Sequence, residues 1–351
     1  MSDSPDGRDL GAPLAAHQID EVALGRYLKA NIPGFGDSCT VQQFRGGQSN
    51  PTYLVESDGR SYVLRKKPPG DLLPSAHAID REFRVIAALA DSQVPVPNAL
   101  HLCEDESVIG QMFYVMDYVA GRVFTDLTLP GCTPAERATA YLSSASVLSN
   151  LHAVDYAAAG LASFGKPDNY VARQIARWSK QYELSKTEEC QAMNELIAWL
   201  PANDPDDQQV SIVHGDFRPG NLIFSNDDMK VAAVLDWELS TIGHPLADLG
   251  YFLLPYRLDA RMRGHSLRGL DLDDLGIPSE QALLDRYCAN GARVSNIDYY
   301  IVFSLFRLAA ILAGVLRRGL DGNASDASAI ERGRAYTLFA ASGVEVMSNL
   351  G

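Results

Sequence analysis

The chain has 351 residues, 46% of them hydrophobic, so it is long enough for two domains or for one domain with two lobes and a sizeable core. Its formal net charge is −14 and its isoelectric point is about 4.9. This acidity disfavours nucleic acid and anionic membrane surfaces as partners, because both attract proteins that carry a positive field.

The cysteines and the N-terminus favour a cytoplasmic protein. The five cysteines are scattered, odd in number and without a C-x-x-C pair, which indicates reduced thiols instead of a disulfide framework or a zinc site. The N-terminus lacks the basic and apolar regions of a signal peptide. Residues Met1–Ala15, rich in Ser, Pro, Asp and Gly, are predicted to be a disordered tail.

Residues 16–118 are predicted to form a β-rich lobe. A short helix over Ile19–Ala30 precedes strands over Val41–Phe44 and Thr52–Glu56. The turn between these strands contains a short polar, glycine-rich run: Gly46, Gly47, Gln48 and Ser49. The backbone N–H groups of such a turn can lie over phosphates, although most Gly-Gly hairpins are simple turns.

A third strand is predicted over Ser61–Lys67, and it contains cationic side chains. Alternation puts Arg65 and Lys67 on the same face of the strand. In the helix predicted over Ile79–Ala90, Glu82 lies on or beside the apolar stripe, so it needs a cationic partner if it is buried. A strand cation such as Arg65 would supply that partner. A cation of this strand could also pair the phosphates of a nucleotide, with Arg65 the first candidate and Lys67 the second; the alternative is that these charges are solvated.

After an apolar strand over Gln111–Val119 the pattern changes from strands to long helices, so residues 119–351 are predicted to be mostly helical. A helix over Pro134–Ala153 has Thr133 as its N-cap. The segment Tyr299–Leu316 is apolar enough to resemble a membrane span, but a charged Arg307 in its middle favours a buried helix.

Two further helices of this region carry polar residues of interest. The helix over Asn169–Ser185 contains Arg173, Arg177 and Trp178, and its two arginines share one face. They either receive an anionic substrate or are solvated. Another helix begins at Pro245, and Asp248 in its first turn is expected to have a structural role.

The polar residues with the most informative spacing follow two short β-branched runs. These runs, Val210–Val213 and Val231–Leu235, are predicted to pair as strands through a polar turn. Asp216 follows the first run, Asn221 comes five residues later, and Asp236 ends the second run. Pairing of the two runs would bring these three side chains to one end of the same small sheet.

Two carboxylates and an amide oxygen at one place suit a hard divalent cation and a phosphate. The spacing H-x-D-x-x-x-x-N, followed by an Asp at a strand end, is typical of kinase catalytic loops. This pattern predicts that Asp216 accepts the proton of the acceptor hydroxyl and that Asn221 and Asp236 hold Mg²⁺. His214 is expected to buttress the loop. Capping of a turn explains Asp216 or Asn221 alone, but not the three residues together.

These motifs carry a resemblance to a known family. The run HGDFRPGNLIF, with VAAVLDWELSTIGHPLADL after it, resembles the aminoglycoside phosphotransferase-like kinases. It is most similar to the kinase-like domain of acyl-CoA dehydrogenase family members 10 and 11. The resemblance implies an α+β, bilobal protein-kinase-like fold and transfer of the γ-phosphate of ATP, with Mg²⁺, to a hydroxyl of a small molecule. It suggests a hydroxyacyl-CoA as acceptor and an acyl-CoA dehydrogenase as a separate partner chain.

Carried over residue by residue, the resemblance puts Arg65 at the position of the phosphate-pairing lysine and Glu82 at that of its helix partner. The glycine-rich turn would cover the phosphates, and a hinge would pair with adenine through the backbone of Met116, Asp117 and Tyr118. The candidate substrate contacts are Arg173, Arg177, Trp178, Arg218 and Glu238. Arg218 stands where relatives often carry His.

Two other hypotheses remain open. A non-catalytic nucleotide-binding module that acts through protein partners is favoured by the arginine at position 65 and by the weak glycine motif. A metal-dependent phosphate-ester hydrolase would usually need a denser cluster of His and Asp than this sequence offers.

Overall fold

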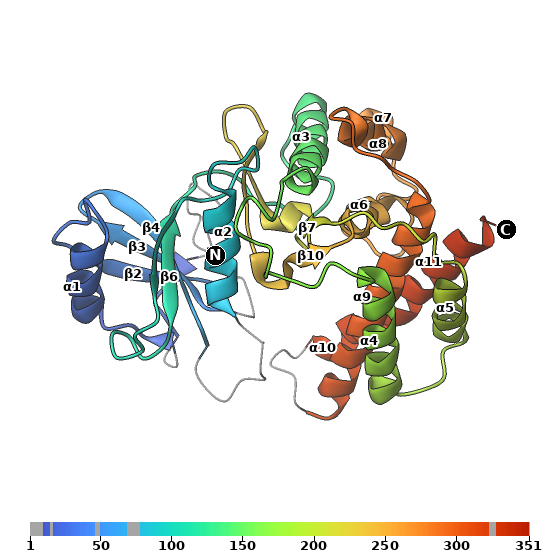
Figure 1. The fold of residues 1–351 in the computed structure, drawn as a ribbon, viewed down its shortest axis with the longest axis horizontal. Helices are drawn as coiled ribbons and strands as arrows, with labels where there is room; N and C mark the ends of the chain where they lie inside the picture. The colour runs from blue at the N-terminus through green and yellow to red at the C-terminus, as the bar shows by residue number, and fades with distance from the viewer. Residues whose placement is uncertain (1–9, 15–16, 46–49, 69–77, 323–327, 351) are drawn as a thin grey trace. The chain divides into compact units, whose positions relative to one another are not determined.

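The computed structural model of the protein describes residues 10–14, 17–45, 50–68, 78–322 and 328–350. The chain divides into two compact units (Figure 1). The first contains the chain up to Val123 together with Asn221–Ser240, and the second contains Phe124–Gly220 and Thr241–Gly351. The first unit is built on an antiparallel sheet and the second is mostly helical, which confirms the α+β prediction. The assignment of a nucleotide lobe ending at residue 118 stays a prediction.

The sheet of the first unit has six antiparallel strands in the order β1-β2-β3-β4-β6-β5. Its strands are β1 (Leu10–Gly11), β2 (Thr40–Phe44), β3 (Thr52–Ser57), β4 (Arg60–Lys66), β5 (Ala99–Cys103) and β6 (Phe113–Asp117). Strand β5 was not predicted, because four of its five side chains are half-buried and show no alternation. The disordered-tail prediction is wrong for β1, which gains backbone hydrogen bonds by pairing with β2.

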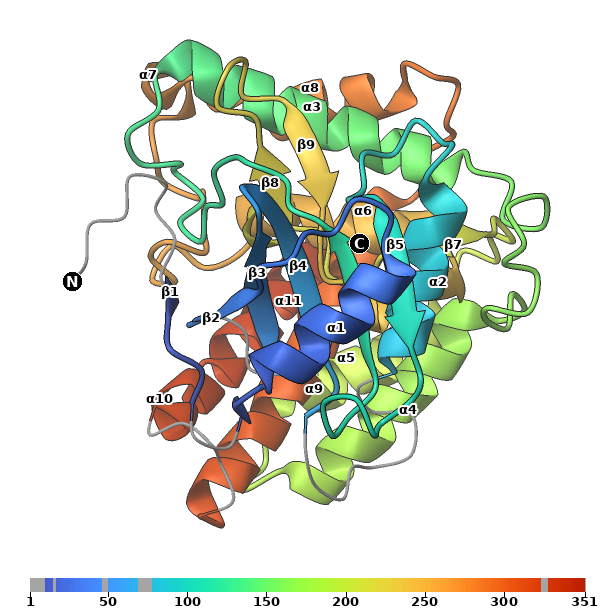
Figure 2. The ribbon, with the colours of Figure 1, turned by 90° about the vertical axis from the view of Figure 1, so that its left-hand side faces the viewer.

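Two helices cover opposite faces of this sheet, and α1 lies across its strands in Figure 2. Helix α1 (Glu21–Asn31) begins after the N-cap Asp20 and packs Leu24 and Leu28 into the core formed with β3 and β4. Helix α2 (Ile79–Leu89) buries its apolar stripe and, with it, Glu82. Helix α2 therefore places the carboxylate of Glu82 in the interior of the first unit.

A separate hairpin of β8 (Leu222–Phe224) and β9 (Val231–Val234) completes the first unit. The predicted pairing was wrong here. The strand that precedes Asp216, β7 (Ser211–Val213), pairs with β10 (Thr241–Gly243) in the second unit. The apolar run of β8 lies directly before the polar turn, so it forms the shorter and closer hairpin with β9.

Helices make up most of the second unit. They are α3 (Pro134–His152), α4 (Tyr170–Ser185), α5 (Gln191–Ala202), α6 (Pro245–Leu253), α7 (Leu272–Leu275), α8 (Glu280–Cys288), α9 (Ile297–Leu320), α10 (Ala329–Arg334) and α11 (Tyr336–Ser348). The predicted start of α3 is confirmed, since the side chain of Thr133 accepts a hydrogen bond from the Glu136 N–H. Helix α5 was not predicted.

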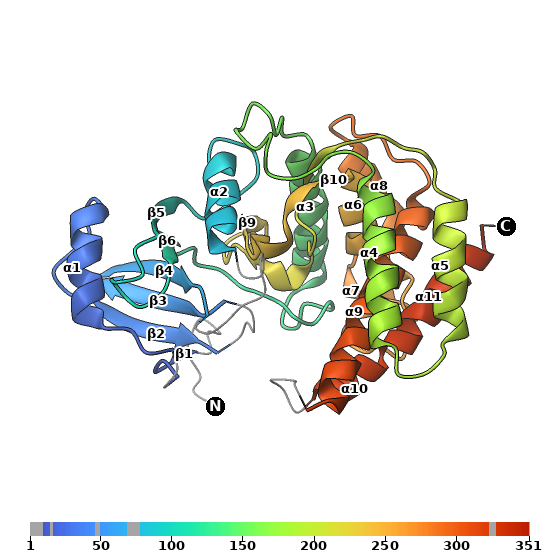
Figure 3. The same cartoon turned by 60° about the horizontal axis from the view of Figure 1, so that its bottom comes forward.

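Helix α9 is the central element of the second unit and packs against α4, α5, α6, α10 and α11 (Figure 3). Within the described residues it is the one helix long and apolar enough to cross a membrane, but 78% of its most apolar window is buried in the structure. The prediction of a buried helix is confirmed. Arg307, in its middle, is also buried.

Candidate active site

The buried carboxylate of Glu82 has its predicted partner on the sheet. Arg65 Nε lies 3.1 Å from Glu82 Oε2, and the two side chains are 12% and 1% exposed. Glu82 also accepts hydrogen bonds from Asn50 Nδ2 at 2.8 Å and from the Tyr114 hydroxyl at 3.2 Å. Arg65 therefore forms the predicted strand-to-helix ion pair. Any contact of Lys67 with a phosphate stays a prediction.

Burial controls the charges of this pair. Burial raises the pKa of the Glu82 carboxyl to about 7, although the charge of Arg65 opposes the shift. Burial acts to lower the pKa of Arg65, but nearby Glu82 and Asp236 are among the groups that raise it above its ordinary value. Arg65 is therefore a fixed cation on which the ionised form of Glu82 depends.

The same guanidinium reaches the carboxylates that follow β9. Arg65 Nη2 lies 2.6 Å from Asp236 Oδ1 and 3.8 Å from Glu238 Oε2. Asp236 has a φ of +63°, in the left-handed region that is strained for a residue with a side chain. The structure thus brings Arg65, Glu82, Asp236 and Glu238 together within the first unit.

Asn221 lies beside Asp236 on the β8–β9 hairpin. The Leu235 N–H donates to the Asn221 carbonyl at 2.9 Å, which places the residue before Asp236 next to Asn221. The Asn221 side chain is buried. An amide oxygen and a carboxylate oxygen are hard donors of the kind that Mg²⁺ takes, so these residues fit the predicted metal.

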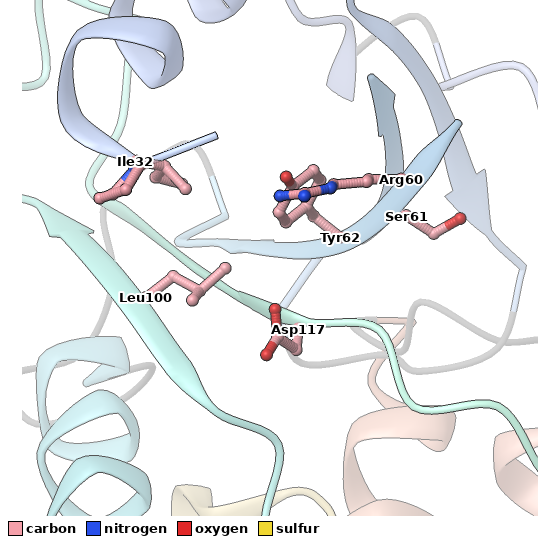
Figure 4. Close-up of a pocket in the computed structure, with 7 residues that line it drawn as sticks. Ile32, Arg60, Ser61, Tyr62, Leu100 and Asp117 are labelled. Atoms are coloured by element: carbon pink, nitrogen blue, oxygen red, sulfur yellow. The ribbon is translucent and has the colours of Figure 1, made fainter. Parts of the chain in front are cut away.

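The predicted hinge contributes side chains to both faces of the sheet. Asp117 lines a pocket of about 300 Å³ on the α1 side (Figure 4). The other lining residues are Ile32, Pro33, Arg60, Ser61, Tyr62 and Leu100. Because side chains alternate along β6, Met116 projects to the opposite face, where Tyr114 contacts Glu82. The adenine contacts predicted for Met116, Asp117 and Tyr118 would be made by backbone atoms, and they stay a prediction. The glycine-rich turn Gly46–Ser49 lies outside the described residues.

In the second unit, helix α6 holds the backbone of the loop that carries Asp216. Gly215 has a φ of +85°, which glycine adopts without strain. The buried Asp248 accepts hydrogen bonds from the N–H groups of His214 and Gly215. Burial acts to raise the pKa of Asp248, but His152 and these donors hold it below its ordinary value. Asp248 is therefore an ionised acceptor, which agrees with its expected structural role.

The side chain of Asp216 is held by two neighbours. Its Oδ1 accepts a hydrogen bond from the Tyr251 hydroxyl, and Arg218 Nε lies 3.3 Å from both carboxylate oxygens. The N–H of Asp216 donates to His214 Nδ1 at 3.2 Å, so His214 buttresses the loop as expected. The role of Arg218 as a substrate contact stays a prediction.

Sequence reasoning missed two residues beside this loop. Tyr251 lies one turn after Asp248 on α6. Arg307 donates a hydrogen bond to the Gly215 carbonyl, and its guanidinium lies 5.5 Å from the centre of the Tyr251 ring. The available signals were the D-x-x-Y spacing in a predicted helix and the single charge in the centre of an apolar one.

The predicted substrate residues of α4 make contacts on its surface. Arg173 Nη2 donates to the Lys166 carbonyl at 2.6 Å, and the Arg177 guanidinium lies 5.2 Å from the centre of the Trp178 ring. Both arginines are exposed. Their contact with an anionic substrate stays a prediction.

Comparison with known proteins places this architecture in a family. The sequence model described as "Phosphotransferase enzyme family" matches residues 40–283, which include Arg65, Glu82, Asp216, Asn221 and Asp236. This chain belongs to the phosphotransferase enzyme family. The family and its structural neighbours identify it as a small-molecule phosphotransferase of the kinase type, and the resemblance expected from the motifs is confirmed.

Among curated proteins, this phosphotransferase is 46% identical over 322 residues to acyl-CoA dehydrogenase family member 10 of Mus musculus, a match that covers 90% of this chain and 30% of that protein. It is 42% identical over 325 residues to member 11 of Homo sapiens, with 90% and 42% covered. The chain therefore spans less than half the length of these relatives.

Solved structures confirm the fold. A Ralstonia eutropha protein classed with the aminoglycoside phosphotransferases has a TM-score of 0.86 and 43% identity, and the match covers 95% of this chain and 99% of that one. Spectinomycin phosphotransferase, in complex with ADP and spectinomycin, has a TM-score of 0.63 at 13% identity, with 94% and 99% covered. The second likeness shows the kinase-like fold alone.

Proposed function

We propose that this phosphotransferase uses ATP and Mg²⁺ to transfer the γ-phosphate to a hydroxyl of a small molecule. The observation that carries the proposal is the Arg65–Glu82 pair, which continues directly to Asp236. A buried ion pair costs desolvation energy and often adds no net stability. Its presence between a strand and a helix is therefore better explained by phosphate positioning, the role of the equivalent pair in kinases.

We assign the roles of the residues by the kinase pattern. Arg65 steadies the phosphates, while Asn221 and Asp236 hold the metal, which supplies neutralisation of phosphate charge. The glycine-rich turn and the backbone of residues 116–118 bind the nucleotide. Asp216 accepts the proton of the acceptor hydroxyl. The complexes with ADP and with GDP named for two structural neighbours support nucleotide use.

For the acceptor we propose a hydroxyacyl-CoA type of molecule. The names of the relatives at 42–46% identity, which are acyl-CoA dehydrogenase family members, support this class. Exposed cations at Arg173, Arg177 and Arg218 suit an anionic acceptor, and Trp178 and Glu238 complete the proposed substrate contacts. A cytoplasmic location and an acyl-CoA dehydrogenase as a separate partner chain belong to the same proposal.

One observation favours a second function, a non-catalytic nucleotide-binding module that acts through protein partners. The guanidinium of Arg65 contacts Asp236 at 2.6 Å, so a proposed metal ligand is already neutralised by a cation. The hydrolase alternative is weaker, because no group of three or more His, Cys, Asp or Glu in the described part of the chain is arranged to hold a metal.

Thermal unfolding with ATP and Mg²⁺, each alone and together, tests the proposed function. At about 100 times its Kd a ligand that binds the folded state adds about 2.7 kcal/mol, so wild type should show a large shift with both ligands. Asp236→Ala should lose that shift. The matched control is Asp228→Ala, which removes an exposed carboxylate from the β8–β9 turn and should keep it.

A shift that survives in Asp236→Ala would contradict the assigned metal site. A second measurement, release of ADP on addition of hydroxylated acyl-CoA thioesters or small alcohols, distinguishes the phosphotransferase from the non-catalytic module. Binding of ATP and Mg²⁺ without turnover across both panels would favour the non-catalytic module.

A further inference from the structure

Helix α6 contacts the Asp216 loop through two side chains that lie one turn apart. Residues three apart on a helix project from the same face, and here they are Asp248 and Tyr251. Asp248 accepts backbone N–H groups of the loop, and Tyr251 donates to the carboxylate of Asp216. The same helix therefore fixes both the path of the loop and the side chain that the loop presents.

Arg307, on helix α9, contacts both the loop and Tyr251. It donates to the Gly215 carbonyl and lies over the Tyr251 ring at 5.5 Å from its centre. Burial and the charge of Asp216 raise the pKa of Tyr251 well above its ordinary value, so the hydroxyl keeps its proton and donates. Arg307 therefore lies against the ring of Tyr251, and the hydroxyl of Tyr251 contacts the carboxylate of Asp216.

The two oxygens of Asp216 have different surroundings. Oδ1 accepts the Tyr251 hydroxyl, which α6 and Arg307 hold in place. Arg218 Nε lies 3.3 Å from both oxygens, and its side chain is 46% exposed, so the Tyr251 hydroxyl is what distinguishes Oδ1 from Oδ2. Without the tyrosine hydroxyl, Oδ1 would lose the donor that distinguishes it from Oδ2. We propose that Tyr251 is a positioning residue that fixes Oδ1 of Asp216, so that Oδ2 receives the proton of the acceptor.

This inference rests on the proposed function, and the step balances as follows. The acceptor oxygen forms a bond to the γ-phosphorus, and the bond between that phosphorus and the β–γ bridging oxygen breaks. The electron pair of the broken bond goes to ADP, and the acceptor proton goes to Asp216 Oδ2. Tyr251 contributes no proton; it holds the carboxylate in the orientation that accepts one.

The test is Tyr251→Phe, which removes the hydroxyl and keeps the ring beneath Arg307. The readout is release of ADP from ATP and Mg²⁺, with water and with 3-hydroxybutyryl-CoA as acceptors. We expect kcat to fall by about 10- to 100-fold while KM for ATP changes by less than about 2-fold. The matched control is Tyr256→Phe, which removes a hydroxyl that donates to the Pro278 carbonyl at 2.6 Å and should leave turnover unchanged.

A double-mutant cycle separates positioning from general damage. In the Asp216→Asn background, Tyr251→Phe should lower turnover by less than about 2-fold further, because the base that Tyr251 positions is gone. A structural defect would instead reduce turnover by the same factor in both backgrounds, and would lower the urea midpoint more than Tyr256→Phe does. Either of those results would refute the positioning role.

The failure of this inference is distinguishable from the failure of the proposed function. If wild type turns over ATP and Asp216→Asn does so about 10²- to 10⁴-fold more slowly, unchanged kcat in Tyr251→Phe overturns the inference alone. If wild type shows no turnover with either acceptor, the proposed function and the positioning role fall together.

Discussion

Replacing Arg65 with Met removes the cation from the buried cluster while keeping much of its apolar volume. Glu82, 1% exposed, would lose its ion pair and keep its hydrogen bonds from Asn50 and Tyr114. Loss of one partner of a buried pair costs about 3–5 kcal/mol. We expect Arg65→Met to lose about 3 kcal/mol of the free energy of unfolding near pH 8, at the lower end because two donors remain.

The penalty should depend on pH in a definite direction. The pKa of Glu82 is about 7 in the folded protein, above its ordinary value of 4.5. Between these values the folded state binds a proton that the unfolded state releases, so stability from this group falls as pH rises through that window. Without Arg65 the pKa of Glu82 rises further. The destabilisation by Arg65→Met should therefore be smaller near pH 6 than near pH 8, by about 1 kcal/mol.

Urea unfolding followed by circular dichroism, at both pH values, measures these differences. The variant Arg65→Met/Glu82→Gln should recover most of the loss near pH 8, because an amide needs no cation. Arg60→Met, at the exposed start of the same strand, should stay within about 0.5 kcal/mol of wild type. A loss below about 1 kcal/mol in Arg65→Met, or a double variant no more stable than the single one, would refute this account of the cluster.

Two further predictions concern the second unit. Asp216→Asn should slow ADP formation by about 10²- to 10⁴-fold with little change in the urea midpoint, and normal turnover would contradict general-base catalysis. His244 caps α6 by accepting the Leu246 N–H, and burial lowers its pKa below 6.5. Because the pKa of His244 is lowered in the folded state, the unfolded state binds a proton first as pH falls below about 6.5. The free energy of unfolding should then decrease by at most about 1.4 kcal/mol per pH unit. In His244→Asn the asparagine can cap the helix but does not titrate, so urea unfolding should show a smaller loss of stability at acid pH than in wild type. An equal loss in the variant and in wild type would show that His244 is not its source.

The family was predictable from local sequence because its motifs rest on spacing along one segment. The pattern from His214 to Asn221 and the strand end at Asp236 predicted the family without any long-range contact. The partner of Glu82 was predictable as well, since a carboxylate on an apolar stripe requires a cation and alternation on β4 presents one to that face. The same reasoning about burial separated α9 from a membrane span.

Contacts between segments far apart in the chain were not predictable in this way. Local pattern could not show that β7 pairs with β10 and leaves β9 to β8, because several apolar runs have equal β propensity and the choice depends on their neighbours. It could not show that Arg65 also reaches Asp236, 171 residues away, or that Arg307 contacts Gly215. Periodicity specifies which face of an element is buried, whereas the partner of each buried polar group depends on how the elements pack, and here that packing puts Tyr251 against Asp216.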